Sequence, residues 1–198
     1  MNKAEHITVL LQEAVEALQI DPDGCYFDGT FGRGGHSRAI LAKLGEHGQL
    51  YATDRDPRAA TTAAAITDAR FHFRRGKFSR FTEYFPELGA ASVDGILLDL
   101  GVSSPQLDEA ERGFSFSREG ELDMRMDPDT KLTAKWFVNH ADYGELVNVI
   151  ACLGEERFAK PIAKHMIKAR SAKMITTTTQ LAAIVSRAIP ARFHAPGR

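Results

Sequence analysis

The first hundred residues alternate between strand-like and helix-like patterns, and this alternation constrains the fold most. Apolar runs and period-two alternation predict four strands, at residues 25–28, 49–54, 71–73 and 93–100. Helical periodicity predicts helices before and between them, at residues 7–18, 37–44, 57–68 and 81–88. Such alternation is typical of a doubly wound α/β fold with a parallel sheet. The last strand is apolar on both faces, as a central parallel strand is.

The pattern changes after Leu100. Residues 101–130 are rich in Gly, Ser, Pro and Asp, as loops are, and no convincing strand follows them. Apolar spacing then predicts helices around Trp136 and over residues 143–153, 157–170 and 180–189. We therefore expect an α/β part over residues 1–104 and a loop with a helical domain over residues 105–198.

A proline interrupts the third of these helices. Pro161 lacks a backbone N–H, so it either starts the helix late or kinks it. Three lysines at a spacing of four residues, Lys160, Lys164 and Lys168, share one face of this helix, and apolar side chains lie roughly opposite.

The composition excludes several classes of protein. With 43% hydrophobic and 26% charged residues, the chain is neither wholly disordered nor collagen-like. No stretch approaches the roughly 18 apolar residues of a membrane span, and the acidic residues among the first 20 argue against a signal peptide. Cys25 and Cys152 cannot form a disulfide framework and lack the spacing of metal ligands. The sequence therefore predicts a cytoplasmic protein with no metal site and no membrane contact.

The charges are distributed unevenly along the chain. The net charge is −1, yet residues 157–198 hold nine Lys or Arg, two His and no acid, whereas residues 108–129 hold eight acids. A basic segment of this kind indicates either a surface for a polyanion or a solvated helix face. The charge pattern alone leaves both interpretations open.

A glycine-rich turn joins the first strand to the following helix, at Asp28–His36 (DGTFGRGGH). Glycines there let a ligand approach the backbone, and Asp54, 26 residues after Asp28 at the end of the second strand, can accept hydrogen bonds from ribose hydroxyls. In the alternative interpretation the glycines only make a tight turn and Asp54 caps the helix near Pro57. Two kinds of nucleoside cofactor are possible, a dinucleotide and S-adenosylmethionine. Ser37 stands where the dinucleotide fingerprint has a third Gly or Ala, and the D-x-x-x-G-x-G spacing is typical of S-adenosylmethionine enzymes. The pattern favours S-adenosylmethionine but does not decide between the two.

Three longer motifs identify a family. They are DLGVSSPQLD at residues 99–108, RGFSF at 112–116 and LDMRMD at 122–127. Together with the glycine-rich turn and the segment DRDP at 54–57, they closely resemble the RsmH (MraW) family, the ribosomal RNA small subunit methyltransferases H. These enzymes methylate N4 of a cytosine in the decoding region of 16S rRNA. The resemblance extends from about His6 to the last residues.

The resemblance implies a class I S-adenosylmethionine-dependent methyltransferase fold, which is Rossmann-like, with a helical domain inserted after the fourth strand. Family members continue further and add the last strands, so we expect an incomplete sheet here with residues 93–100 at its edge. The cofactor contacts implied by the resemblance are Gly34, Gly35, His36, Asp54, Phe78, Asp99 and Gln106. Phe78 would stack on adenine, and Asp99 is a candidate acceptor for a proton of the target amine.

The implied partner is 16S rRNA in the small ribosomal subunit, with RNA contacts expected in the basic segment. An alternative function is that of a truncated, inactive remnant, which binds cofactor or RNA without methyl transfer. A nucleotide-dependent oxidoreductase is disfavoured by Ser37 and by the motifs after Asp99. The sequence leaves a homodimer open.

Overall fold

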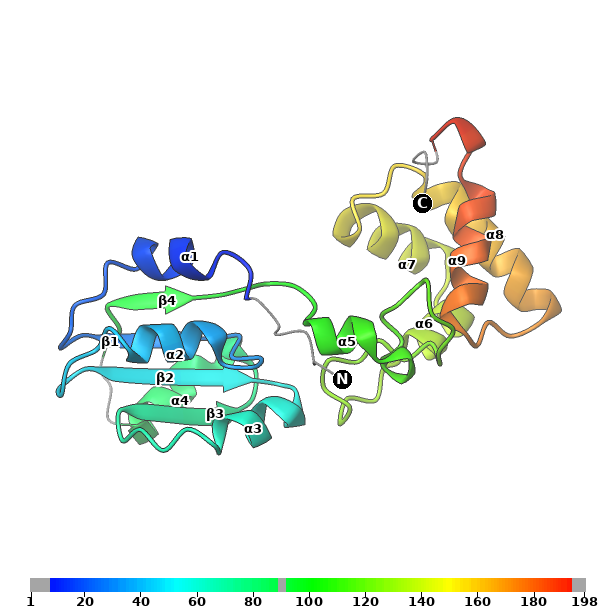
Figure 1. Ribbon diagram of the computed structural model, residues 1–198. Coiled ribbons are helices and arrows are strands. Elements are labelled where there is room, and N and C mark those ends of the chain that lie inside the picture. Colours follow the sequence, from blue (N-terminus) through cyan, green and yellow to red (C-terminus); the bar gives the residue numbers. More distant parts are fainter. Residues whose placement is uncertain (1–7, 89–91, 194–198) are drawn as a thin grey trace, which may run out of the picture. The chain divides into compact units, whose positions relative to one another are not determined.

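The computed structural model describes residues 8–88 and 92–193, which fold into two compact units (Figure 1). The first unit is Met1–Gly101 and the second is Val102–Arg198. Ile7, where the sequence predicts the first helix to begin, lies outside the described residues, as do His194 and Arg198 of the basic segment.

The first unit is built on a parallel sheet of four strands. These are β1 (Cys25–Asp28), β2 (Gln49–Asp54), β3 (Phe71–Arg75) and β4 (Gly95–Leu97), in the order β3-β2-β1-β4. In the register of the sheet, Phe27 of β1 lies between Tyr51 of β2 and Ile96 of β4. The predicted α/β fold with a parallel sheet is confirmed.

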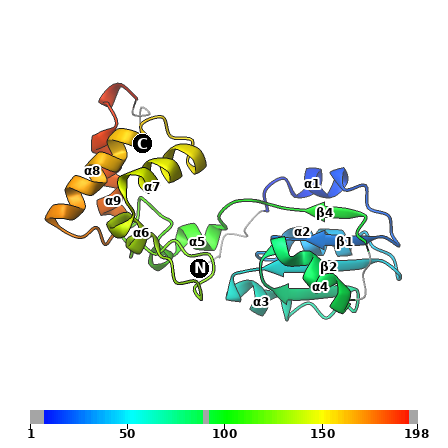
Figure 2. The ribbon, with the colours of Figure 1, turned by 180° about the vertical axis from the view of Figure 1, so that it is seen from behind.

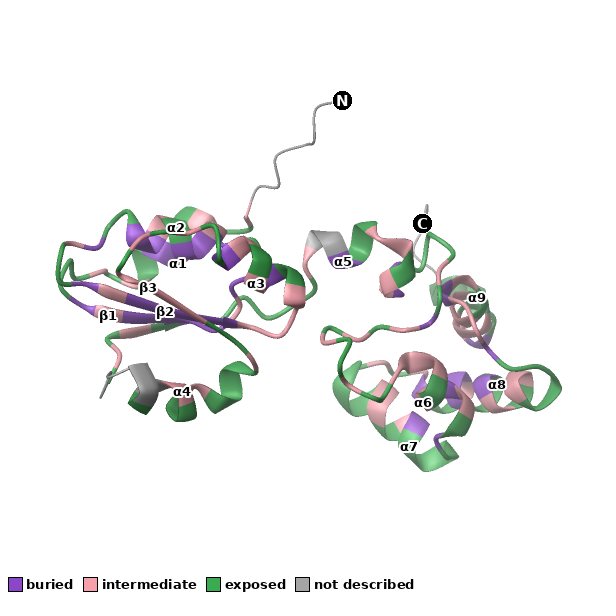
Figure 3. Cartoon of the chain, turned by 90° about the horizontal axis from the view of Figure 1, so that it is seen from below, coloured by how far each residue is buried: buried purple, intermediate pink, exposed green. Residues whose placement is uncertain are grey.

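Helices cover both faces of this sheet (Figure 3). On one side lie α1 (Leu11–Ala17), α2 (Gly35–Leu41) and α3 (Pro57–Ala63), and on the other lies α4 (Phe81–Leu88). Successive strand residues point to opposite faces, so Tyr26 joins Ile40 and Leu50 in the core under α1 and α2, while Phe27 stacks on Phe81 of α4 with ring centroids 5.4 Å apart.

The strand β4 is shorter than the eight residues predicted. Its partner β1 ends at Asp28, where the chain turns away, so the residues after Leu97 have no strand to pair with. The N–H of Gly29 donates to the carbonyl of Leu97 (2.9 Å), and this bond closes the ladder. The strand lies at the edge of the four-stranded sheet, where Ile96 is 45% exposed and Leu98 42%.

The helix α3 also differs from its predicted extent, ending at Ala63 rather than near residue 68. It begins as its sequence predicts, with Asp56 capping it and Pro57 at its first position. After Ala63 the chain bends so that Ile66 packs on the core and the sheet resumes at β3. Packing of Ile66 in the folded unit thus outweighs the helix propensity of the alanine run.

The second unit is helical (Figure 2). It contains α5 (Ser104–Asp108), α6 (Ala134–His140), α7 (Tyr143–Asn148), which continues as a π-turn over Val149–Leu153, α8 (Ala159–Ala172) and α9 (Thr178–Ala188). Within the described ranges of this unit, the only extended pairing is an isolated bridge between Glu121 and Thr177. Pro161 lies in the first turn of α8, where no intrahelical bond is lost, so it marks a late start and not a kink.

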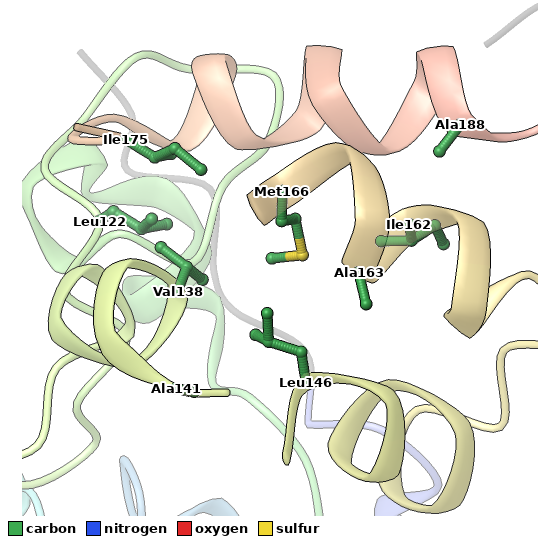
Figure 4. Packing of buried hydrophobic residues seen from close by; sticks show 9 residues of the cluster. All are labelled: Leu122, Val138, Ala141, Leu146, Ile162, Ala163, Met166, Ile175 and Ala188. Carbon is green, nitrogen blue, oxygen red and sulfur yellow. The ribbon is translucent and has the colours of Figure 1, made fainter. Parts of the chain in front are cut away.

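Nine buried residues form the core of this unit (Figure 4). They come from α6 and the residue that follows it, from α7, α8 and α9, and from the loops before α6 and α9: Leu122, Val138, Ala141, Leu146, Ile162, Ala163, Met166, Ile175 and Ala188. Ile162 and Met166 point inward from α8, which leaves Lys160, Lys164 and Lys168 on its exposed face as their spacing predicts.

The motif LDMRMD is a structural loop in this unit. The guanidinium of Arg125 binds both carboxylate oxygens of Asp123 (2.8 and 2.7 Å) and the carbonyls of Pro128 (2.7 Å) and Thr130 (2.9 Å). This pairing holds the pKa of Asp123 below its ordinary value. Arg112 donates to the carbonyl of Arg125 (3.2 Å), so a hydrogen bond joins the two motifs RGFSF and LDMRMD.

Across the described residues, no helix is long and apolar enough to span a membrane.

Candidate functional site

The turn between β1 and α2 has a backbone that requires glycine. Gly32 and Gly34 have φ angles of +54° and +74°, in the left-handed region. A Cβ on Gly34 would lie 2.7 Å from the ring of Phe31, so a side chain there would clash as well as strain the backbone. The turn leads into α2, whose first N–H groups have no acceptor within the helix.

Asp28 holds this turn together from inside the unit. Its carboxylate is fully buried and accepts hydrogen bonds from the backbone N–H of Thr30 (3.0 Å) and the hydroxyl of Ser37 (2.6 Å). The two bonds connect the start of the turn to the first turn of α2. Burial raises the pKa of Asp28 above its ordinary value, and the two hydrogen bonds oppose that shift.

Asp54 at the end of β2 contacts the same turn. One carboxylate oxygen accepts the N–H of Gly32 (2.8 Å) and the other accepts the N–H of Asp56 (2.9 Å). The cap of α3 is Asp56, which accepts the N–H of Arg58 (3.0 Å), so the alternative interpretation of Asp54 as that cap is wrong. Each oxygen of Asp54 keeps a further lone pair with which it can accept a ligand hydroxyl.

Phe78 and Asp99 meet the first residues of the turn. Phe78 begins the short 3₁₀ helix Phe78–Arg80, and its Cβ lies 2.9 Å from where a Cβ on Gly29 would be. Its side chain is 37% exposed, which leaves ring surface for a ligand. The backbone N–H of Asp99 donates to the hydroxyl of Thr30 (2.7 Å), and the Asp99 side chain is exposed. The carboxyl ends of β1, β2 and β4 therefore bring Asp54, Asp99 and the glycines to one edge of the sheet.

His36, in the first turn of α2, has an unused polar atom. The residue is only 5% exposed, and its Nε2 has no hydrogen-bond partner among the described residues. A buried polar atom without a partner costs about 1–3 kcal/mol, which a ligand could recover. The donor set of this edge, with carboxylates, an unused imidazole nitrogen and an exposed aromatic ring, fits a nucleoside.

Thr8, Thr30 and Leu98 also line the turn, and sequence reasoning did not single them out. Thr8 lies against Gly35, with its Cβ 3.0 Å from where a Cβ on that glycine would be, and Leu98 lies against Gly29 in the same way. Thr30 holds the backbone of Asp99. These contacts join residues far apart in the chain, so no local pattern reveals them.

The chain matches the MraW methylase family over residues 3–196. It belongs to that family. The ribosomal RNA small subunit methyltransferases H of Nitrosospira multiformis, Dichelobacter nodosus and Thiobacillus denitrificans are 56%, 54% and 54% identical to it, over 97%, 99% and 94% of its length. The matched regions cover 61%, 64% and 60% of those proteins, so the chain spans about three fifths of the length of these relatives.

Membership of the MraW methylase family makes the first unit a class I methyltransferase fold, a fold whose members generally take their methyl group from S-adenosylmethionine. Six of the seven expected cofactor residues lie in this unit, around or next to the glycine turn. The seventh, Gln106, belongs to α5 of the second unit. There it is 6% exposed, and its side-chain oxygen accepts the N–H of Ser103 (2.9 Å). In the described part of the chain, no three His, Cys, Asp or Glu side chains gather as metal ligands would.

The buried carboxyl of Asp28 makes the stability of this MraW family member depend on pH. The raised pKa means that the folded state holds its proton more tightly than the unfolded state, so this residue stabilises less as pH rises above about 3.8. Asp28→Asn has no titrating group, and the unfolding free energy of the wild type should therefore fall relative to this variant from about pH 4 upward. Urea unfolding followed by circular dichroism at several pH values measures the difference. If the unfolding free energy of the wild type minus that of Asp28→Asn stayed constant or rose with pH, the raised pKa of Asp28 would be contradicted.

Proposed function

We propose that this chain contains the cofactor site and part of the substrate surface of an S-adenosylmethionine-dependent methyltransferase that modifies N4 of a cytosine in 16S rRNA. The main support is the family match along residues 3–196, together with the gathering of six expected residues at the edge of the sheet. The relatives' name, ribosomal RNA small subunit methyltransferase H, supports the small subunit as partner and therefore the cytoplasm as location.

The residues at the glycine turn would divide the adenosyl group and the amino-acid end of the cofactor between them. Asp54 would accept the ribose hydroxyls with its free lone pairs, and Phe78 would stack its exposed ring on adenine. Gly34, Gly35 and His36 would surround the amino-acid end, where the unused Nε2 of His36 meets a polar group. The bound cofactor supplies an electrophilic methyl group on a sulfonium.

Little acid–base chemistry is required of the chain, because an amine displaces a methyl group from sulfur without a covalent intermediate on the enzyme. The lone pair of an exocyclic cytosine amine is delocalised into the ring, so an acceptor for its N–H makes it a better nucleophile. Asp99 is our candidate for this acceptor because its carboxylate is exposed while its backbone is held by Thr30. Positioning of the reactants and exclusion of water supply the remainder of the rate enhancement.

The exposed edge of β4 supports a further part of this proposal. Ile96 and Leu98 are large apolar residues that a strand normally buries, and they are almost half exposed in this unit. The relatives are longer than the region they share with this chain. We therefore propose that in those proteins additional strands pair with the counterpart of β4 and cover these side chains.

Transfer of labelled methyl from S-adenosylmethionine to small ribosomal subunits lacking the modification tests the function. We expect label at N4 of a single cytosine. Cofactor binding without transfer would instead support the inactive remnant, and label on a different base or on protein would refute the substrate assignment.

Asp99→Ala tests the double role of Asp99 toward cofactor and amine. Loss of transfer together with weaker cofactor binding is expected, because the carboxylate serves both. If the variant loses transfer but keeps its cofactor and RNA affinities, the cofactor half of the role is wrong. Asp94→Ala is the matched control, since Asp94 precedes β4 and its carboxylate accepts the N–H of Cys25 (2.7 Å) at the opposite end of the strand.

A further inference from the structure

Two arginines and two phenylalanines cluster at the start of α8. The guanidinium carbon of Arg157 lies 4.2 Å from the ring centroid of Phe193 and 4.8 Å from that of Phe158. Arg192 also lies over the Phe193 ring, at 4.9 Å, and the two rings are 5.2 Å apart. We call these four residues the arginine–phenylalanine cluster. It joins the 3₁₀ turn Ala191–Phe193 to the beginning of α8 and leaves Phe193 41% exposed.

A row of lysines continues from this cluster along α8. Lys160, Lys164 and Lys168 are exposed and follow one another at four-residue intervals, so they form a stripe about 12 Å long on one face of the helix. None of the three pairs with an acid in the ranges that the structure describes. The opposite face of α8 is buried in the core through Ile162 and Met166, which fixes the direction in which the stripe points.

The charge of the segment that follows Glu156 in the sequence is one-sided. No acid occurs after Glu156, and the carboxylate of Glu156 itself accepts the N–H of Phe158 (2.7 Å). Cations in a row attract a chain of phosphates, and an exposed aromatic ring next to them offers a surface on which a base can stack. The arrangement of a stacking platform beside a cationic track is typical of proteins that bind single-stranded nucleic acid.

We propose that the arginine–phenylalanine cluster and the lysine stripe of α8 together bind a single-stranded segment of RNA, with phosphates along the lysines and a base on Phe193. This inference rests on the proposed function and extends it, because it locates a substrate contact outside the cofactor site. The basic face is thus a binding surface and not only a solvated helix face.

The test is binding of the 198-residue chain to a fluorescein-labelled single-stranded RNA of 16 nucleotides, measured by anisotropy over a range of salt concentrations. The triple variant Lys160→Gln/Lys164→Gln/Lys168→Gln should bind at least about tenfold more weakly, and the slope of log K against log salt should become shallower by about 2. The control, Lys43→Gln/Lys131→Gln/Lys173→Gln, removes the same charge from exposed lysines off the stripe and should leave the slope unchanged.

Phe193→Leu tests stacking separately. It keeps an apolar side chain but loses the ring, and the affinity for single-stranded RNA should fall about 5-fold to 150-fold. Phe193→Tyr keeps the ring and should bind about as tightly as the wild type. Urea unfolding followed by the fluorescence of Trp136 verifies that the helical unit remains folded.

Several results would overturn the inference. They are no RNA binding by the wild type, equal losses in the stripe and control variants, an unchanged affinity in Phe193→Leu, or stronger binding to phosphatidylglycerol vesicles through the same lysines. Calorimetry with S-adenosylmethionine separates failure of the RNA-binding inference from failure of the proposed function. If cofactor binds and RNA does not, the surface is wrong and the cofactor site stands; in the reverse case the proposed function fails and the surface stands.

Discussion

Asp54→Ala should weaken the binding of S-adenosylmethionine at least a hundredfold. The cofactor would lose the two hydrogen bonds that we propose between its ribose hydroxyls and this carboxylate, each worth about 1.5–3 kcal/mol because the acceptor is charged. It would also release the N–H of Gly32, so the glycine turn would no longer be held against β2. Isothermal titration calorimetry measures the affinity directly.

Asp56→Ala is the control for this prediction because the two aspartates are two residues apart and have different roles. Asp56 caps α3 through the N–H of Arg58 (3.0 Å), and its loss should lower the unfolding free energy by about 1 kcal/mol. We expect its cofactor affinity to stay close to that of the wild type. Equal losses of affinity in the two variants would mean that Asp54 acts only through the stability of the unit.

Leu146→Ala should lower the unfolding free energy of the helical unit by about 2–5 kcal/mol. Leu146 is fully buried in the core of that unit, so truncation should leave a cavity among its neighbours (Figure 4). Trp136, the only tryptophan of the chain, belongs to the same unit and reports its unfolding by fluorescence. The fluorescence transition should therefore move to a lower urea concentration.

The matched control is Leu153→Ala, since Leu153 is 79% exposed and its loss should change stability by less than about 0.5 kcal/mol. Cofactor affinity should be unchanged in both variants at concentrations of urea that unfold neither unit. A shift below about 1 kcal/mol for Leu146→Ala would contradict the packing described for this core.

The bounds of β1 and β2 are predicted to the residue, whereas β3 extends two residues beyond the predicted 71–73, to Arg75, and β4 is shorter than predicted. Both β1 and β2 follow a glycine, and their contiguous apolar residues are buried on both faces of the sheet. The length of β4 depends on its partner, because β1 supplies only three paired positions to it before the chain turns at Gly29. Pairing between residues about 69 positions apart leaves no mark in the local pattern.

The same distinction applies to the candidate site. The glycines at positive φ and Asp54 belong to a compact motif with a fixed interval, so the sequence points to them. The hydrogen bond from Asp99 to Thr30 and the contact of Thr8 with Gly35 depend on the folded unit and appear only in the structure. Pro161 is an intermediate case, because the sequence allows two outcomes and the start of α8 at Ala159 decides between them.

The central claim is that the turn between β1 and α2, together with Asp54 and Phe78, forms the site for S-adenosylmethionine. Calorimetric titration of the 198-residue chain with S-adenosylhomocysteine, the product of methyl transfer, tests it most directly. We predict saturable binding of one ligand per chain that is lost in Asp54→Ala and kept in Asp56→Ala. Absence of binding by the wild type, or binding that Asp54→Ala leaves intact, would contradict the claim.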